Sequence, residues 1–317
     1  MEEISNLFED EGYLLEKSLA TDTWGELYRA RYVAHDREVL FRRFPDGLGA
    51  DDGAWELTCA EIQAWARLDH PGILQVLDWG KAPTGPYLVT EMPRGTLLAD
   101  ILTEDEGMEM PGDVFRNLLM TVEAARQWGV LHLGLDLTSV WVAGDGAVEV
   151  GEFGLAYVSK EFPAHGGADD LFLAPEQSRG QRVSAATDVY TLGLLFMALS
   201  GGLAEAREAA QGGAVTEGLG ELRPVLARCL DEQPLARYHS AGELAGAMGF
   251  DPEQWLYEEY RDCPLCRLKS ELERDAGRGS KRRRAGLAAA VGELQYRWAA
   301  IVALAAVTFL VWWLALR

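Results

Sequence analysis

Two short motifs in the middle of the chain decide how this 317-residue sequence is interpreted: GVLHLGLDLTSVWV at Gly129–Val142 and GEFGLA at Gly151–Ala156. Five further motifs flank them in a definite order. From the N-terminal side these are LDHPGIL at Leu68–Leu74, YLVTE at Tyr87–Glu91, LAPEQ at Leu173–Gln177, ATDVYTLGLLF at Ala186–Phe196 and RCLDEQPLARY at Arg228–Tyr238. Each motif is weakly specific alone, whereas the whole set in order and at consistent spacing is a strong signal.

The sequence around these motifs predicts an α+β fold. Short β-branched or aromatic runs at 28–33, 37–44 and 87–91 favour strands. Apolar residues at helical spacing predict a helix over 54–68, and residues 113–129, 188–200 and 220–230 also have helical patterns. A small β-rich lobe followed by a mainly helical lobe is the expected arrangement.

Together the motifs resemble those of the eukaryotic-type Ser/Thr protein kinase domain, over about three quarters of the chain. The resemblance implies a bilobal protein-kinase-like fold. The expected organisation is an N-terminal extension (1–12), a kinase-like domain (13–250, with the N-lobe 13–91 and the C-lobe 92–250), a charged linker (251–297) and an apolar helix (298–316).

Phosphoryl transfer needs a glycine-rich loop over the phosphates, a lysine that binds them, a base near the acceptor hydroxyl and two metal ligands. The resemblance places Ala20, Asp22 and Gly25 at the three loop glycines, so only one glycine remains. The lysine position holds Arg42, which keeps the positive charge and is expected to pair with Glu61.

The catalytic loop departs further from the family pattern. His132 is kept, but the base position holds Gly134, which cannot accept a proton. The following lysine position holds Asp136, which reverses the charge, and the two metal-ligand positions hold Ser139 and Glu152. We therefore expect none of these positions to be catalytically competent.

Three positions concern the adenine pocket that the resemblance implies. Thr90 occupies the gatekeeper position, Leu40 replaces a small alanine in the ceiling, and Trp141 replaces a leucine-sized residue in the floor. We expect Leu40 and Trp141 to fill the pocket from within. The alternative is that Trp141 points aside and leaves room for a nucleotide.

Residues that support the fold are present, unlike those that serve the reaction. His132 and Phe153 match the internal apolar stack of the family, and Asp188 matches the aspartate that anchors it. Glu176 is expected to pair with Arg237. A kinase-like sequence that retains its structural residues but has replaced its catalytic residues is typical of a pseudokinase.

The C-terminal segment 298–316, WAAIVALAAVTFLVWWLAL, has no charged residue. As a helix its nineteen residues span about 28 Å, close to the thickness of the hydrocarbon core of a bilayer. The basic run 281–284 precedes it, and the N-terminus has no signal-peptide pattern. These features predict a single-pass anchor in a cytosol-facing membrane, with the kinase-like domain in the cytosol and the C-terminus across the membrane.

Charge and cysteine content limit the partners. The net charge is −21, and the first 266 residues carry about −27, which argues against nucleic acid as a partner. Cys263 and Cys266 form one CxxC, which is half of a zinc site. Two chains would complete four thiolates, a redox role is an alternative, and a linker without a metal is the interpretation we favour.

The sequence favours a membrane-anchored pseudokinase that acts as a signalling scaffold or regulatory binding module for an unidentified cytosolic protein, without a cofactor. One alternative is a weakly active or atypical Ser/Thr protein kinase, which would need ATP and Mg²⁺. A second alternative is a non-catalytic nucleotide-binding switch.

Overall fold

The computed structural model describes residues 8–250, except 9, 23, 103–106, 109–110, 157, 159–169 and 213–216. The chain divides into two units, Met1–Pro252 and Glu253–Arg317, and all described residues belong to the first. The predicted linker, the CxxC and the apolar segment 298–316 lie outside the described residues. Among the described residues, no helix combines the length and the apolar character needed to cross a membrane.

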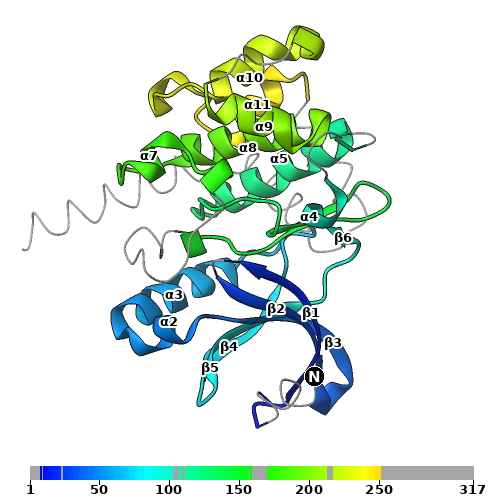
Figure 1. The fold of residues 1–317 in the computed structure, drawn as a ribbon, viewed down its shortest axis with the longest axis vertical. Helices are drawn as coiled ribbons and strands as arrows, with labels where there is room; N and C mark the ends of the chain where they lie inside the picture. The colour runs from blue at the N-terminus through cyan, green and yellow to red at the C-terminus, as the bar shows by residue number, and fades with distance from the viewer. Residues whose placement is uncertain are drawn as a thin grey trace, which may run out of the picture. The chain divides into compact units, whose positions relative to one another are not determined.

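The N-terminal lobe is built on a five-stranded antiparallel sheet with the strand order β1-β2-β3-β5-β4 (Figure 1). The strands are β1 (Tyr13–Asp22), β2 (Gly25–Tyr32), β3 (Arg37–Arg43), β4 (Val76–Ala82) and β5 (Gly85–Glu91), and the helices are α2 (Asp46–Ala50) and α3 (Asp52–Trp65). The Asp51 side chain caps α3 by accepting a hydrogen bond from the Ala54 amide at 3.0 Å.

Both faces of this sheet carry buried side chains, as the central strand β3 shows. Because side chains alternate along a strand, Leu40 and Arg42 of β3 face the cleft, whereas Phe41 faces the opposite side. Phe8 covers that opposite face, with its ring centroid 4.7 Å from that of Phe41 and 5.7 Å from that of Tyr87. Phe8 is fully buried, so the hydrophobic core of the lobe reaches into the segment 1–12 that the sequence assigns to an extension.

The C-terminal lobe is mainly helical. Its elements are β6 (Thr96–Leu97), α4 (Leu98–Ile101), α5 (Pro111–Gln127), β7 (Val140–Val142), β8 (Val148–Val150), α7 (Pro175–Ser178), α8 (Ala185–Gly201), α9 (Leu203–Ala210), α10 (Arg223–Cys229) and α11 (Ala241–Ala247). Helix α8 is buried on all sides from Ala186 to Leu199, as expected of a central helix. The sheet β6-β7-β8 lies at the junction with the other lobe (Figure 1).

The lobes are joined by backbone hydrogen bonds at the back of the cleft. The Leu74 amide donates to the Val150 carbonyl at 2.9 Å, and the Val150 amide donates to the Gly72 carbonyl at 2.8 Å. The Trp65 indole, at the end of α3, donates to the Leu74 carbonyl at 2.8 Å. The structure therefore confirms the predicted bilobal α+β fold and fixes the residues that face each other across the cleft.

Candidate functional site

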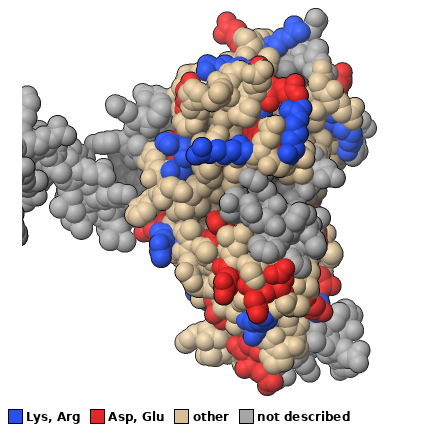
Figure 2. Space-filling model, turned by 90° about the vertical axis from the view of Figure 1, so that its left-hand side faces the viewer, with Lys and Arg blue, Asp and Glu red and all other residues tan. Residues whose placement is uncertain are grey.

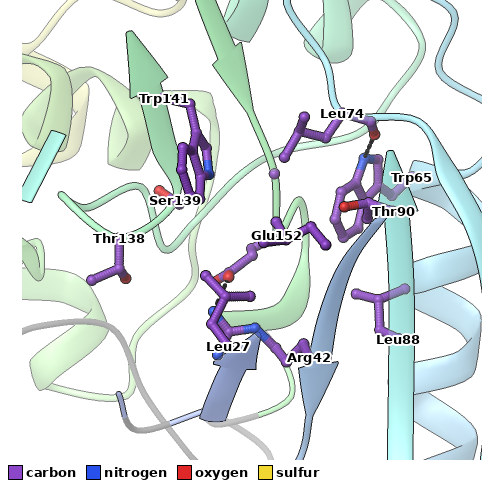
Figure 3. A pocket seen from close by; sticks show the side chains of 12 residues that line it. Leu27, Arg42, Trp65, Leu74, Leu88, Thr90, Thr138, Ser139, Trp141 and Glu152 are labelled. Carbon is purple, nitrogen blue, oxygen red and sulfur yellow. Dashed lines mark hydrogen bonds and ion pairs between the residues drawn. The ribbon is translucent and has the colours of Figure 1, made fainter. Parts of the chain in front are cut away.

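The cleft between the lobes holds a small cavity (Figure 3). The space open to the centre of a water-sized sphere is about 20 Å³, whereas one water molecule needs about 10–15 Å³ of such space. The lining residues come from both lobes: Leu27, Leu40, Arg42, Trp65, Leu74, Leu88, Thr90, Thr138, Ser139, Trp141, Gly151 and Glu152.

Leu40 and Trp141 both line this cavity, and both are 6% exposed. Thr90 lies beside Leu40 in the structure, because β3 and β5 place the two residues opposite each other in register. The Thr90 hydroxyl donates to the Glu91 carbonyl at 3.1 Å. The side chains of Leu40 and Trp141 thus line and narrow the region where the resemblance places adenine.

An ion-pair cluster centred on Arg42 occupies the end of the cleft where phosphates and metal would bind in the family. The Arg42 guanidinium is 2% exposed and donates to both oxygens of Asp22, at 2.7 and 2.9 Å. It also donates to Glu152 Oε1, so one cation joins two carboxylates. Such a fork-shaped contact is the strong geometry for a guanidinium.

The expected pair between Arg42 and Glu61 is therefore wrong. Glu61 lies on α3 against the backbone of Gly154, where a Cβ would come within 2.3 Å of Glu61 Oε2. Burial raises the pKa of the Glu61 carboxyl. Arg42 pairs with Asp22 and Glu152 instead, because these two acids lie at positions that the resemblance gives to a glycine and to a metal-binding aspartate.

Among the described residues of this region, carboxyl groups outnumber cations. The Glu152 side chain is 12% exposed, and desolvation together with the charges of Asp22 and Asp136 raises its pKa, against the opposing effect of Arg42. Desolvation likewise raises the pKa of Asp136. The cluster is thus short of positive charge. Even so, no group of three or more acidic, histidine or cysteine side chains among the described residues has a geometry that could hold a metal ion.

The Asp136 side chain accepts hydrogen bonds from the residues that follow it, which the sequence did not suggest. Its Oδ1 accepts hydrogen bonds from the Thr138 amide at 2.8 Å, the Thr138 hydroxyl at 2.8 Å and the Ser139 amide at 3.0 Å. The Ser139 hydroxyl meets the Asp136 backbone, accepting from the amide at 3.0 Å. Asp136 and Ser139 therefore close the turn that leads into β7.

The glycine-rich loop is closed by the same acidic residue that binds Arg42. Asp22 Oδ1 accepts from the Trp24 amide at 2.7 Å, which fixes the turn between β1 and β2. Gly25 has φ +107°, and a Cβ there would lie 2.1 Å from the Arg43 carbonyl oxygen, so only glycine fits. Trp24, which follows this turn, is buried against Phe44. Ala20 lies in β1, opposite Leu27.

The catalytic loop presents no proton acceptor at Gly134, and its neighbours are held by hydrogen bonds. The Asp188 carboxylate accepts from the backbone amides of His132 at 3.0 Å and Leu133 at 2.7 Å. Gln177 donates from its side chain to the Leu133 carbonyl, a contact that sequence reasoning missed. The loop is thus fixed from α8 and from α7.

His132 belongs to the expected internal stack. Its ring centroid lies 4.6 Å from that of Phe153, which lies 6.4 Å from that of Trp65. His132 Nε2 contacts the Gly151 carbonyl at 2.8 Å, so the neutral ring donates there. Burial lowers the pKa of His132 to about 4, because a protonated Nδ1 would find no acceptor among the described residues. His132 is a packed structural residue.

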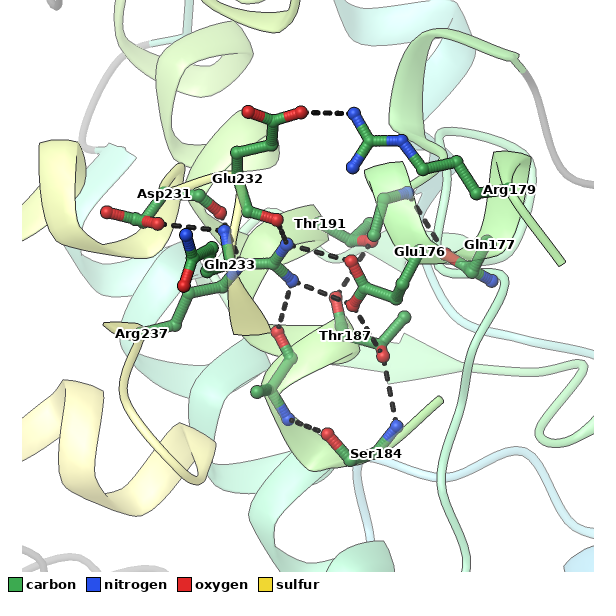
Figure 4. A network of polar contacts seen from close by, with 12 residues as sticks. Glu176, Gln177, Arg179, Ser184, Thr187, Thr191, Asp231, Glu232, Gln233 and Arg237 are labelled. Atoms are coloured by element: carbon green, nitrogen blue, oxygen red, sulfur yellow. Dashed lines mark hydrogen bonds and ion pairs between the residues drawn. The ribbon is translucent and has the colours of Figure 1, made fainter. Parts of the chain in front are cut away.

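The expected pair of Glu176 with Arg237 is present (Figure 4). The two side chains form two parallel hydrogen bonds of 2.8 Å, and both residues are almost fully buried. Arg237 also donates to the carbonyls of Asp231 at 2.7 Å and Ala186 at 3.0 Å. The pair therefore ties α7 to α8 and to the loop before α11.

Comparisons with known proteins identify the family. Residues 13–217 match the protein kinase domain family, and the chain belongs to that family. The serine/threonine-protein kinase PknB of Mycobacterium tuberculosis is 31% identical over 205 residues, which cover 60% of this chain and 32% of PknB. PknL of the same organism is 28% identical over 196 residues, covering 60% of this chain and 49% of PknL.

The match spans about a third of the length of PknB and about half of the length of PknL. The crystal structure of the kinase domain of Mycobacterium tuberculosis PknI has a TM-score of 0.61 and 23% identity to this chain. The similarity covers 75% of this chain and 95% of the PknI kinase domain. These comparisons confirm the kinase fold and a kinship with Ser/Thr kinases.

Figure 2 shows one face of the molecule, where acidic and basic side chains are interspersed over both lobes.

Proposed function

We propose that this protein kinase domain transfers no phosphate and acts as a regulatory binding module or scaffold in signalling. The observation that carries the proposal is the cluster of Arg42 with Asp22 and Glu152. The residues that would bind phosphate and metal bind one another instead. Gly134 points the same way because it cannot act as a base. Leu40 and Trp141, which line the cavity, add bulk where adenine would bind.

The residues of the cleft do not fit ATP with Mg²⁺. A triphosphate would meet the carboxyl groups of Asp22, Asp136 and Glu152, and the neighbouring Arg42 guanidinium is already paired with Asp22 and Glu152. A metal ion at Glu152 would have to displace the Arg42 guanidinium. We therefore derive no step of phosphoryl transfer from this site.

The second candidate is an active or atypical Ser/Thr protein kinase that uses ATP and Mg²⁺. The comparisons taken alone favour it over our main proposal, because the relatives are named Ser/Thr kinases. The geometry of the cleft is our reason for placing it second. We further propose that residues 298–316 hold the domain at a cytosol-facing membrane, where it meets a cytosolic protein partner and no nucleic acid.

A phosphate-transfer assay separates the two candidates. The full chain is incubated with γ-labelled ATP and either Mg²⁺ or Mn²⁺, alone and with general acceptor proteins. The variant Gly134→Asp, which returns a carboxylate to the base position, is assayed beside it. We expect no labelled protein from either chain, because the phosphate site stays occupied. Labelling by the natural chain would establish the kinase alternative, and labelling by Gly134→Asp alone would show that ATP reaches the cleft.

A further inference from the structure

Arg42 lies where the phosphates and the metal ion of a nucleotide complex would bind in the family. We propose that the Arg42 guanidinium, held between Asp22 and Glu152, is a built-in substitute for the nucleotide–metal complex and keeps the two lobes closed without a ligand. This inference rests on the proposed function, since it assumes that no ATP enters the cleft. We call Asp22, Arg42 and Glu152 the clasp.

The clasp joins parts of the chain that belong to different lobes. Asp22 ends β1 and Arg42 lies in β3, both in the N-terminal lobe, whereas Glu152 follows β8 in the C-terminal lobe. Figure 3 shows Glu152 reaching across the cleft to the Arg42 side chain. The Arg42–Glu152 contact is therefore a bond between lobes, and the Arg42–Asp22 contact fixes the direction in which the guanidinium points.

The two contacts of the clasp each replace one part of the nucleotide–metal complex. The Asp22 carboxylate gives Arg42 the two oxygen atoms that a phosphate group would otherwise supply. The guanidinium gives Glu152 the positive charge that a metal ion would otherwise supply. All three side chains are at most 14% exposed, so water screens these charges only weakly.

The clasp adds a side-chain contact close to backbone hydrogen bonds that already join the lobes. At the back, Gly72 and Leu74 share backbone hydrogen bonds with Val150 of β8. Glu152 lies only two residues beyond Val150, and its φ of +66° turns the backbone so that the side chain meets Arg42. The lobes are thus joined here by backbone hydrogen bonds and, two residues further along the chain, by the Arg42–Glu152 contact.

Removing one half of the clasp tests this arrangement without leaving a buried charge unpaired. Glu152→Leu leaves Arg42 with its two bonds to Asp22 and removes only the contact between lobes. Asp36→Asn is the matched control, because Asp36 also pairs with an arginine, Arg31 at 2.8 Å, but within the N-terminal lobe and at the surface. Both variants remove one carboxyl group that pairs with an arginine.

Amide hydrogen exchange of the full chain, followed by mass spectrometry, measures the opening of the cleft. We expect Glu152→Leu to exchange at least about 10-fold faster over 20–27 and 151–155, the two segments that face each other, and Asp36→Asn to exchange there at the natural rate. ATP with Mg²⁺ should leave the amide exchange rates of the natural chain unchanged. Equal rates in Glu152→Leu and the natural chain would overturn the proposal, as would strong protection of 20–27 by ATP with Mg²⁺.

The failures of the two proposals are distinguishable. Phosphate transfer by the natural chain, with the expected exchange pattern intact, would contradict the proposed function and leave the closing contact standing. Unchanged exchange in Glu152→Leu, with no phosphate transfer, would contradict the clasp alone.

Discussion

Replacing Arg237 by methionine tests the energetic role of the buried pair with Glu176. The substitution keeps most of the side-chain volume and removes both hydrogen bonds of 2.8 Å to the carboxylate. Glu176 then keeps only the Thr187 hydroxyl, at 2.8 Å, as a described donor, inside a site that is 1% exposed. Breaking a buried pair in this way costs about 3–5 kcal/mol.

Thermal unfolding of the full chain, followed by circular dichroism, measures this loss. For a domain of this size we expect Arg237→Met to lower the melting temperature by roughly 10 °C. The control is Arg179→Met, because Arg179 pairs with Glu232 at the exposed surface, and such a pair contributes less than about 1 kcal/mol.

The double variant Arg237→Met with Glu176→Leu sharpens the test. It removes the unpaired carboxylate as well, so it should be more stable than Arg237→Met alone. A loss below about 1 kcal/mol for Arg237→Met would refute the reasoning, and so would a double variant no more stable than the single one.

Three further predictions concern the core, the stack and the cleft. Phe8→Ala should cost about 3–5 kcal/mol because Phe8 is fully buried, whereas Leu235→Ala, at an 87% exposed position, should leave the denaturation midpoint unchanged. His132 has a pKa of about 4 in the folded protein and about 6.5 when unfolded, so its stabilising contribution is full above pH 6.5 and is lost as the pH falls towards 4. When the pH falls from 6.5 to 4.5, His132→Phe should therefore lose up to about 2 kcal/mol less free energy of unfolding than the natural chain, as measured by urea titration. The same loss in both chains would contradict this. Leu40→Ala should cost about 2–5 kcal/mol in the same assay, and a neutral result would show that Leu40 does not fill the cleft.

The fold and the structural supports could be predicted from the sequence because they depend on short motifs in a fixed order. The pair of Glu176 with Arg237 is an example, since both residues sit inside recognisable motifs. The stack of His132 with Phe153 and its anchor Asp188 follow for the same reason. In these cases a residue's neighbours along the chain already specify its place in the fold.

The partner of Arg42 could not be predicted in this way. The sequence shows acids at Asp22 and Glu152, but each acid appears there as a separate departure from the family pattern. Their convergence on one guanidinium depends on how the turn after β1 and the backbone after β8 approach β3. Two acids gained around a kept cation are the signal that would have indicated a compensating cluster.

Phe8 shows a second limit of motif-based reasoning. It lies before the first motif, and nothing in its own neighbourhood marks it as part of the core. The signal lies elsewhere, in Tyr13, Phe41 and Tyr87, which place large aromatic rings on the second face of the sheet. A sheet that is apolar on both faces needs a cover on each, and Phe8 supplies part of one.

The most direct test of the central claim is the melting temperature of the full natural chain with and without saturating ATP and Mg²⁺. A ligand at 100 times its dissociation constant stabilises the folded state by about 2.7 kcal/mol, which corresponds to a shift of roughly 5–10 °C for a domain of this size. The occupied cleft predicts no measurable shift. A shift of that size would contradict the account, because it would show that the nucleotide displaces Arg42 from Asp22 and Glu152 or opens the space between Leu40 and Trp141.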